Sequence, residues 1–458
     1  MRTMLRRADS LLNSRGDGLI PTWWLVVFVL THGLIAAALL TVHILPKPFG
    51  DGDYWTTAVA IARWLCTGRA ASIEFVKGPM TPIYYLPVGV VGFLFGKAWM
   101  LWSARVYNLV LVTLSSVLLV KVFAGSRRHT LVLMALVLAV PAQVYYSMGI
   151  LAEPPTYTAV CLCAIGWAGL VRFPMKRKYV LLLSAAMFCL GGLRPNLIPV
   201  GLVGAVLSLV ALVLGRNSEN HLLHRRLVVS GAAAFLGLVL LSTGLRATGL
   251  VNESFTRREV ARALVAGRYQ FRARWWDLRF FDEGARGEND PDLLAYRRAL
   301  ASMGRRQEWT VGGATQLVLS DLRAHPVTFL RVSALKALYS GMWVPLRVWG
   351  WIFGDAPPTK VVIAGLAVIW CSLWALLCWA PLVWLCRRGV SNLATTWPIW
   401  LPWAGVLAFV MLFGMEPRYV FPGKVAVVLC VSWLVPSLGP VLSGEHPTLL
   451  DSSQDLGQ

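Results

Sequence analysis

Residues 153–214 decide the fold, and they read EPPTYTAVCLCAIGWAGLVR, FPMKRK, YVLLLSAAMFCLGGL, RPN and LIPVGLVGAVLSLVALVL. Three apolar runs, 153–172, 178–192 and 196–214, are separated by one basic loop and one tight turn. A helix needs about 20 mainly apolar residues to cross a bilayer. The stretch therefore predicts three consecutive transmembrane helices.

The composition of the whole chain is also typical of a membrane protein. Of the 458 residues, 57% are hydrophobic and 14% are charged, whereas soluble domains carry about 25% charged residues. The net charge of +21 comes mostly from short Lys and Arg clusters between apolar runs, and a nucleic-acid-binding protein gathers such residues on one face. The composition excludes a soluble domain and a disordered chain, and we expect no nucleic-acid partner.

Two further features of the chain narrow its class. The eight cysteines form no CxxC pair and no Cys/His metal spacing, so neither a disulfide framework nor a zinc site is indicated. The first apolar run, 21–45, is too long for the apolar core of a signal peptide, and no small-residue cleavage site follows it. We expect this run to be an uncleaved first span.

The same reasoning along the chain predicts an all-α integral membrane protein with about ten transmembrane helices. The predicted spans are 21–45, 105–124, 130–149, 153–172, 178–192, 196–214, 227–248, 359–385, 397–414 and 424–441. Two further apolar stretches, 81–99 and 326–353, are ambiguous by hydropathy. If either crossed the bilayer, basic loops such as Arg127-Arg128 or Arg387-Arg388 would face outward, against the positive-inside rule. We therefore expect both stretches to lie along the outer interface.

This topology predicts how the chain is organised. We expect a cytoplasmic N-terminus over 1–20 and a membrane core over 21–248 that contains a first outer loop, 46–104. A second extracytoplasmic segment with surface helices follows over 249–358. The C-terminal spans occupy 359–441, and a cytoplasmic tail occupies 442–458.

Two carboxylates follow the first predicted span. Asp51 and Asp53 are flanked by glycines and followed by Tyr54 and Trp55, where a helix would begin. One interpretation is a general base or a metal-binding pair at the membrane surface. The other is helix capping, because Asp near a helix N-terminus accepts backbone N–H bonds.

Further ionisable residues lie on the same predicted outer side. Lys77 precedes a Gly-Pro turn, so it either binds a phosphate or is an interfacial lysine. Glu153 opens a span, where a carboxylate indicates either a functional site or a helix cap. Arg194 and Arg418 lie in tight turns; each either contacts a lipid phosphate or pairs with an acid such as Glu153.

Several of these motifs, in this order, resemble the GT-C glycosyltransferases that use polyprenyl-phosphate sugars, of the protein mannosyltransferase and aminoarabinose transferase type. The matching pieces are Gly50-Asp51 with Tyr54, Trp55 and Ala58; Lys77-Gly-Pro79 through Tyr84, Tyr85 and Leu94-Phe95-Gly96 to Arg105; Leu151-Ala-Glu153; Leu193-Arg194-Pro195; His325-Pro326 through Lys336 and Trp343; and Glu416-Pro-Arg418-Tyr419 to Pro422. The family often has Asp-Glu in the first loop, whereas Gly52 follows Asp51 here.

The resemblance implies a GT-C fold and an inverting glycosyltransferase with an extracytoplasmic active site. Asp51 or Asp53 would be the general base. Lys77, Arg194 and Arg418 would bind the donor phosphate, and Glu153 would orient the acceptor or bind a cation. Supporting roles would fall to Tyr54, Tyr84, Tyr85, Arg105 and Tyr419. No cofactor is required, although a divalent cation fits the acidic pair.

The donor would be a polyprenyl-phosphate sugar in the bilayer, and the acceptor a glycan, lipid or protein. The Arg-rich, Lys-poor cytoplasmic loops favour a bacterial plasma membrane. Two alternative functions use the same residues differently. A transporter or flippase of lipid-linked sugars or other anionic lipids would need the cations but no base, and a ligase or scaffold subunit would use the outer loop to recruit a partner.

Overall fold

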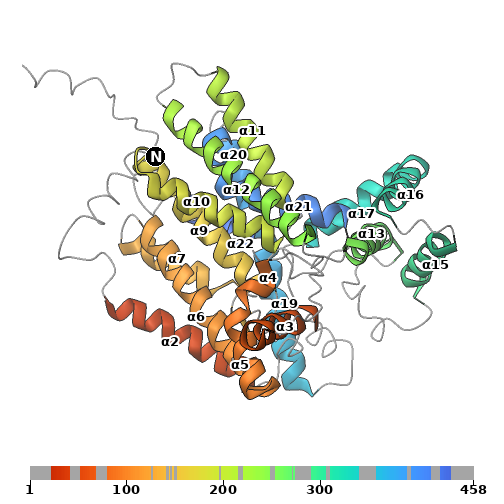
Figure 1. Cartoon of the computed structure of the whole chain (residues 1–458), viewed down its shortest axis with the longest axis horizontal. Helices are drawn as coiled ribbons and strands as arrows, with labels where there is room; N and C mark the ends of the chain where they lie inside the picture. Colours follow the sequence, from red (N-terminus) through yellow and green to blue (C-terminus); the bar gives the residue numbers. More distant parts are fainter. Residues whose placement is uncertain are drawn as a thin grey trace, which may run out of the picture.

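The computed structural model describes residues 22–41, 52–68, 80–124, 127–140, 144, 147–148, 152–194, 197–214, 220–247, 253–270, 272–273, 290–305, 310–339, 357–388, 393–413 and 423–434. Every secondary-structure element longer than one turn in these ranges is a helix. Most of the helices form one bundle, and a smaller group lies at its side (Figure 1). The prediction of an all-α protein is confirmed.

Eleven of the described helices fall within or overlap the ten predicted spans. They are α2 (Thr22–Thr41), α6 (Lys97–Phe123), α7 (Arg127–Leu138), α9 (Glu153–Arg172), α10 (Arg177–Leu193), α11 (Ile198–Leu214), α12 (His221–Ala247), α19 (Pro358–Leu377) with α20 (Ala380–Arg388), α21 (Leu393–Leu412) and α22 (Lys424–Leu434). By length and composition, five described stretches could cross a membrane: Lys97–Phe123, Glu153–Arg172, His221–Gly244, Pro358–Arg387 and Leu393–Leu412. Shorter apolar helices occupy Val26–Ala38, Ala58–Thr67, Leu86–Phe95, His129–Leu138, Gly201–Leu214 and Lys424–Leu434.

Several predicted boundaries were wrong, for local reasons. α6 begins at Lys97 rather than at residue 105, because Gly96 adopts a φ of +89° between two helices and fixes the break there. α7 ends at Leu138, well short of 149, since Pro141 follows and a proline disfavours helical conformation in the residue before it. α22 is described as far as Leu434, and residues 435–441 of the predicted span lie outside the described residues.

The ambiguous stretch 81–99 is broken into short helices. α4 (Met80–Tyr84) and α5 (Leu86–Phe95) are separated at Tyr85, and α6 starts immediately after Gly96. Ten residues of helix extend about 15 Å, half the thickness of the hydrocarbon core. α5 is therefore too short to span a bilayer alone.

α9 is the central helix of the bundle. Most of its side chains are buried, and it packs against α6, α10 and α21. Polar side chains along it have partners, since Tyr157 shares a hydrogen bond of 3.0 Å with Ser116 and Trp167 Nε1 donates to the Thr395 carbonyl at 2.5 Å. By contrast, α12 and α19 expose many large apolar side chains, as helices that face lipid do.

Four helices form a separate group that we call the loop module: α13 (Glu253–Tyr269), α15 (Pro291–Arg305), α16 (Val311–Ala324) and α17 (Pro326–Tyr339). They share a small apolar core that includes Val265, Leu293 and Ala314. The module lies beside the end of α21 (Figure 1). α17 covers the first half of the ambiguous stretch 326–353, and residues 340–353 lie outside the described residues.

Candidate functional site

The structure describes five of the predicted site side chains: Tyr84, Tyr85, Arg105, Glu153 and Arg194. Asp53 and Tyr54 lie in the first turn of α3 (Gly52–Thr67), but their side chains are outside the described part of the chain. The remaining predicted residues, Asp51, Lys77, Arg418 and Tyr419, lie outside it altogether. Their roles stay predictions.

Glu153 and Arg194 form an ion pair where α9 begins and α10 ends. The two helices are antiparallel neighbours, so these ends meet. The Glu153 side chain is 2% exposed and that of Arg194 is 18% exposed. A buried carboxylate is tolerated only with a compensating partner, and Arg194 supplies it. The alternative in which Arg194 pairs with Glu153 is confirmed. Because the Arg194 side chain is partly exposed, a solute can still reach it.

The two tyrosines converge on an asparagine that the sequence analysis missed. Tyr84 Oη donates to Asn108 Oδ1 at 3.2 Å, and Asn108 Nδ2 donates to Tyr85 Oη at 3.1 Å. Burial raises the pKa of Tyr84 well above its usual range, with Tyr85 and Tyr107 adding to the effect, so Tyr84 is a neutral donor. An amide within an apolar helix was the signal in the sequence that could have identified Asn108.

Close packing brings α3 to the same place. A Cβ added at Gly89 of α5 would overlap the carbonyl of Ala58 in α3, so only glycine permits this approach. Ala58, Tyr85 and Ala104 share one buried cluster with Ala152, the residue before Glu153. Three segments of the predicted motif therefore meet: the helix that follows Asp51, the short surface helices and the start of α9.

Arg105 ties α6 to the chain that precedes α9. Its Nε donates to the Met148 carbonyl at 3.4 Å, and its guanidinium lies 4.8 Å from the centroid of the Trp102 ring. In the described structure these contacts give Arg105 a structural role, because they join two elements of the site.

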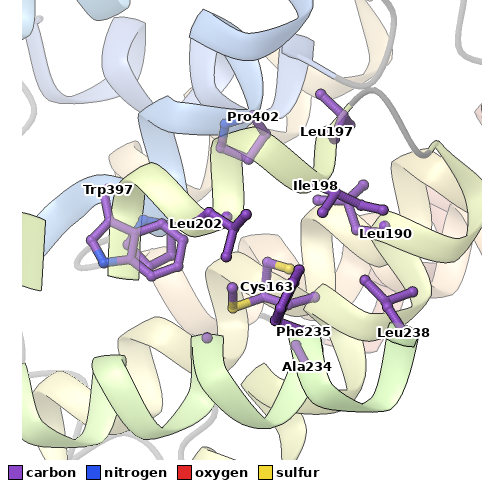
Figure 2. A pocket seen from close by; sticks show the side chains of 15 residues that line it. Cys163, Leu190, Leu197, Ile198, Leu202, Ala234, Phe235, Leu238, Trp397 and Pro402 are labelled. Carbon is purple, nitrogen blue, oxygen red and sulfur yellow. The ribbon is translucent and has the colours of Figure 1, made fainter. Parts of the chain in front are cut away.

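An apolar pocket adjoins the turn that carries Arg194 (Figure 2). Leu190 and Gly191 come from the end of α10, and Leu197 and Ile198 follow the turn. The pocket continues between α9, α12 and α21 and encloses about 40 Å³. Leu202 and Phe235 are lining residues exposed at the bundle surface.

No metal centre emerges from the described residues, among which no three His, Cys, Asp or Glu side chains cluster. The predicted cation site depends on Asp51 and Asp53, whose side chains are not among them. A divalent cation at that pair stays a prediction.

In comparisons with known proteins, the sequence matches no family model, and a search of curated proteins finds no match. The GT-C resemblance therefore rests on the motifs, and the function has to be argued from the site.

Proposed function

We propose that the chain is a membrane glycosyltransferase that moves a sugar from a polyprenyl-phosphate donor to an acceptor hydroxyl. In this proposal the protein has ten spans in a GT-C arrangement, and its site faces the extracytoplasmic side of a bacterial plasma membrane. One observation carries the proposal: an apolar pocket adjoins the turn with a partly exposed arginine. That combination suits an amphiphile with an anionic head and a long apolar tail.

The reaction would be a single displacement. Asp51 or Asp53 accepts the proton of the acceptor hydroxyl while that oxygen attacks the anomeric carbon. The bond from that carbon to the phosphate oxygen breaks on the opposite face, so the configuration inverts and the lipid phosphate leaves with the electron pair. Lys77, Arg194 and Arg418 would stabilise its charge, and Glu153 would keep Arg194 in place. The packing of α3 against α5 supports a fixed position for the base.

The proposal is tested first at the carboxylates. Asp51→Asn and Asp53→Asn are compared with wild type in reconstituted protein, with transfer and donor binding measured separately. Loss of a general base costs about 10²–10⁴-fold in rate. We expect one variant to lose transfer to this extent while it still binds donor. If both variants transfer at the wild-type rate, the base assignment fails.

The second test fills the pocket. Gly201 lines the pocket, and a Cβ there would lie 3.6 Å from Met187 Cε, in van der Waals contact, so the longer side chain of Gly201→Leu would occupy pocket space. Gly365→Leu is the matched control, since nothing lies within 4 Å of a Cβ at Gly365. We expect donor affinity to fall at least tenfold in Gly201→Leu and to stay unchanged in the control. Equal donor affinity in the two variants would show that the donor does not bind in this pocket.

A flippase for lipid-linked sugars is the second candidate, because the same pocket would suit it. It needs no base, so both Asn variants would keep moving lipid across the bilayer.

A further inference from the structure

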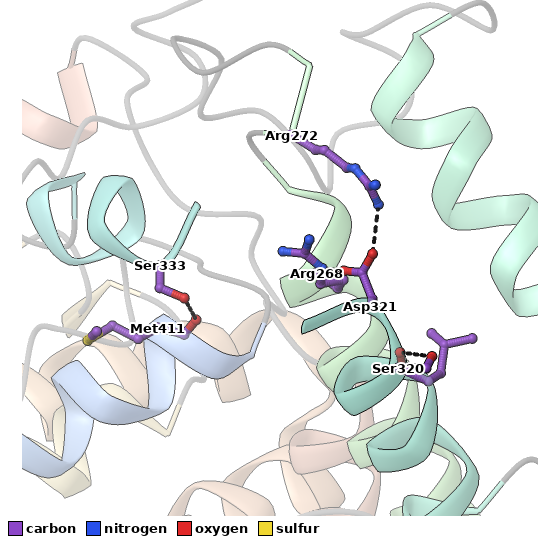
Figure 3. A network of polar contacts seen from close by, with 7 residues as sticks. Arg268, Arg272, Ser320, Asp321, Ser333 and Met411 are labelled. Carbon is purple, nitrogen blue, oxygen red and sulfur yellow. Dashed lines mark hydrogen bonds and ion pairs between the residues drawn. The ribbon is translucent and has the colours of Figure 1, made fainter. Parts of the chain in front are cut away.

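A cluster of charged side chains lies within the loop module, on helices other than those of the Glu153–Arg194 pair. Arg268 on α13 forms an ion pair with Asp321 on α16, and Arg272 approaches the same carboxylate at 3.4 Å. Figure 3 shows Arg272 directed at the Asp321 carboxylate, with Arg268 lying beside it. Lys336 on α17 donates from Nζ to the Phe413 carbonyl, at the end of α21, at 3.1 Å.

Two of these cations are almost completely removed from solvent. Arg268 is 2% exposed and Lys336 is 1% exposed. Arg268 Nη2 has no hydrogen-bond partner among the described residues. An ammonium group has three donors, and a single acceptor for Lys336, Phe413 O, is found in the described part of the chain. Hydrogen-bond donors therefore remain available on both side chains.

The charges in the cluster are not balanced. In the part of the chain that the structure describes, Arg268 and Arg272 share one carboxylate, Asp321. Asp292 also lies nearby, since it accepts from the Ala273 amide, and so does Arg331, which donates to the Arg272 carbonyl. With Lys336, four cations therefore accompany two carboxylates. Burial and the nearby charge of Arg268 lower the pKa of Lys336 to about 7. Burial and the nearby Arg272 lower the pKa of Arg268 to about 10. A bound anion would relieve this repulsion and favour both charged forms.

We propose that Arg268, Arg272 and Lys336 form an anion-binding site that takes an oxyanion group such as a phosphate or sulfate. Asp321 holds the Nε side of the Arg268 guanidinium, and the Phe329 ring lies 5.2 Å from that guanidinium. The Nη2 side is left for the ligand. The side chains of Arg272 and Asp321 are 30% and 13% exposed, so the anion reaches the cluster from their side.

This site does not depend on sugar transfer. The same chemistry would recognise a lipid phosphate headgroup or a free anion in solution, and the cluster serves either source. Its proximity to the end of α21 connects it to the bundle, because Ser333 Oγ also donates to the Met411 carbonyl at 3.3 Å. Binding there would stabilise the contact between the module and α21.

The test titrates the purified full-length protein with sulfate, whose charge is constant between pH 6 and pH 9, at fixed ionic strength. Lys336→Met removes the amine and keeps a long apolar side chain that suits a buried position. Arg323→Gln is the matched control, because Arg323 is an exposed cation on α16 of the same module. We expect sulfate affinity to fall at least tenfold in Lys336→Met and to stay within twofold of wild type in the control.

A second variant keeps the proposal falsifiable if Lys336→Met unfolds. Lys336→Arg retains a cation whose charge persists to high pH. Wild-type sulfate affinity should fall at least fivefold between pH 6 and pH 9 as Lys336 deprotonates, whereas Lys336→Arg should show no such fall. Absence of saturable sulfate binding, or identical affinities and pH profiles in wild type and both Lys336 variants, would overturn the proposal.

The two ligand sources are separated in nanodiscs with and without polyprenyl phosphate. If the lipid phosphate occupies the cluster, polyprenyl phosphate lowers the apparent sulfate affinity of wild type and of Arg194→Lys, but not that of Lys336→Met. If the ligand is a free anion, the lipid leaves sulfate affinity unchanged. Either result supports the site, and competition that persists in a Lys336→Met protein with wild-type sulfate affinity contradicts it.

Discussion

The Glu153–Arg194 pair and the Arg268–Lys336 cluster both place cations at helix ends, but they balance the charge differently. Arg194 pairs with the buried carboxylate of Glu153, beside an apolar pocket. In the loop module, two arginines share Asp321, and Lys336 contacts a backbone carbonyl. The comparison teaches that a carboxylate for each cation supports local structure, whereas an excess of cations leaves hydrogen-bond donors for the anion that we propose.

The largest expected effect comes from breaking the balanced pair. Arg194→Gln leaves the buried Glu153 carboxylate without this partner, and removal of one member of a buried ion pair costs about 3–5 kcal/mol. We expect the free energy of unfolding, measured in detergent, to fall by that amount. The double variant Glu153→Gln with Arg194→Gln removes both charges and should recover most of the loss.

If the double variant is as unstable as Arg194→Gln, the two side chains do not depend on each other. In that case Glu153 and Arg194 would not stabilise the fold by neutralising each other's charge, which is the property that distinguishes the pair from the cluster. Arg323→Gln, which removes one exposed cation, serves as the control and should stay within about 0.5 kcal/mol of wild type.

A smaller effect is expected where α3 packs against α5. Gly89→Ala forces a Cβ against the Ala58 carbonyl, and overpacking of this kind typically costs about 1–3 kcal/mol. Gly33→Ala is the matched control, because nothing lies within 4 Å of its Cβ position. We expect a lower thermal midpoint for Gly89→Ala only, together with reduced transfer since α3 follows the proposed base. Equal midpoints would show that the approach of the two helices is loose.

A further effect, spread over several pH units, is the pH dependence of stability due to Lys336. Its pKa is about 7 in the folded protein and 10.5 in an ordinary environment, so the unfolded chain binds more protons between these values. Stability therefore rises with pH across that window and is unaffected by Lys336 outside it. The contribution is at most about 1.4 kcal/mol per pH unit.

This slope is measured as the difference between wild type and Lys336→Met in unfolding experiments from pH 7 to pH 10. Parallel curves for the two proteins would show that Lys336 titrates normally. Burial in the cluster would then not lower the pKa of Lys336, and the cluster would not differ from the Glu153–Arg194 pair in this respect.

Hydropathy predicted where the helices lie, because a long apolar run has few alternatives to a helix in a bilayer. It located α9, α10 and α11 to within a few residues. The predicted helix boundaries were wrong where a single residue ends or begins a helix, as at Gly96 and before Pro141. From the sequence, the Glu153–Arg194 ion pair was only one of the alternatives for Arg194, because the sequence does not reveal which helix ends meet.

Other buried polar residues were harder to predict. Asn108 stood out in the sequence only as an amide within an apolar helix, and Arg268 looks like an ordinary polar residue of its helix; the burial of both follows from neighbours far along the chain. Lys424 is similar: it opens α22 fully buried, with Nζ 5.8 Å from the centroid of the Trp374 ring. The predicted span 424–441 begins at this lysine, but its burial follows from the packing of α22 against α20 and α21.

The most direct test of the central claim follows a doubly labelled polyprenyl-phosphate sugar in wild-type proteoliposomes, with a total membrane extract as the source of acceptor. We expect the sugar label to appear on the acceptor and free polyprenyl phosphate to form in equal amount, with both products lost in the inactive Asn variant. If the donor instead crosses the bilayer with both labels still joined, the protein moves lipid-linked sugars and is not a glycosyltransferase.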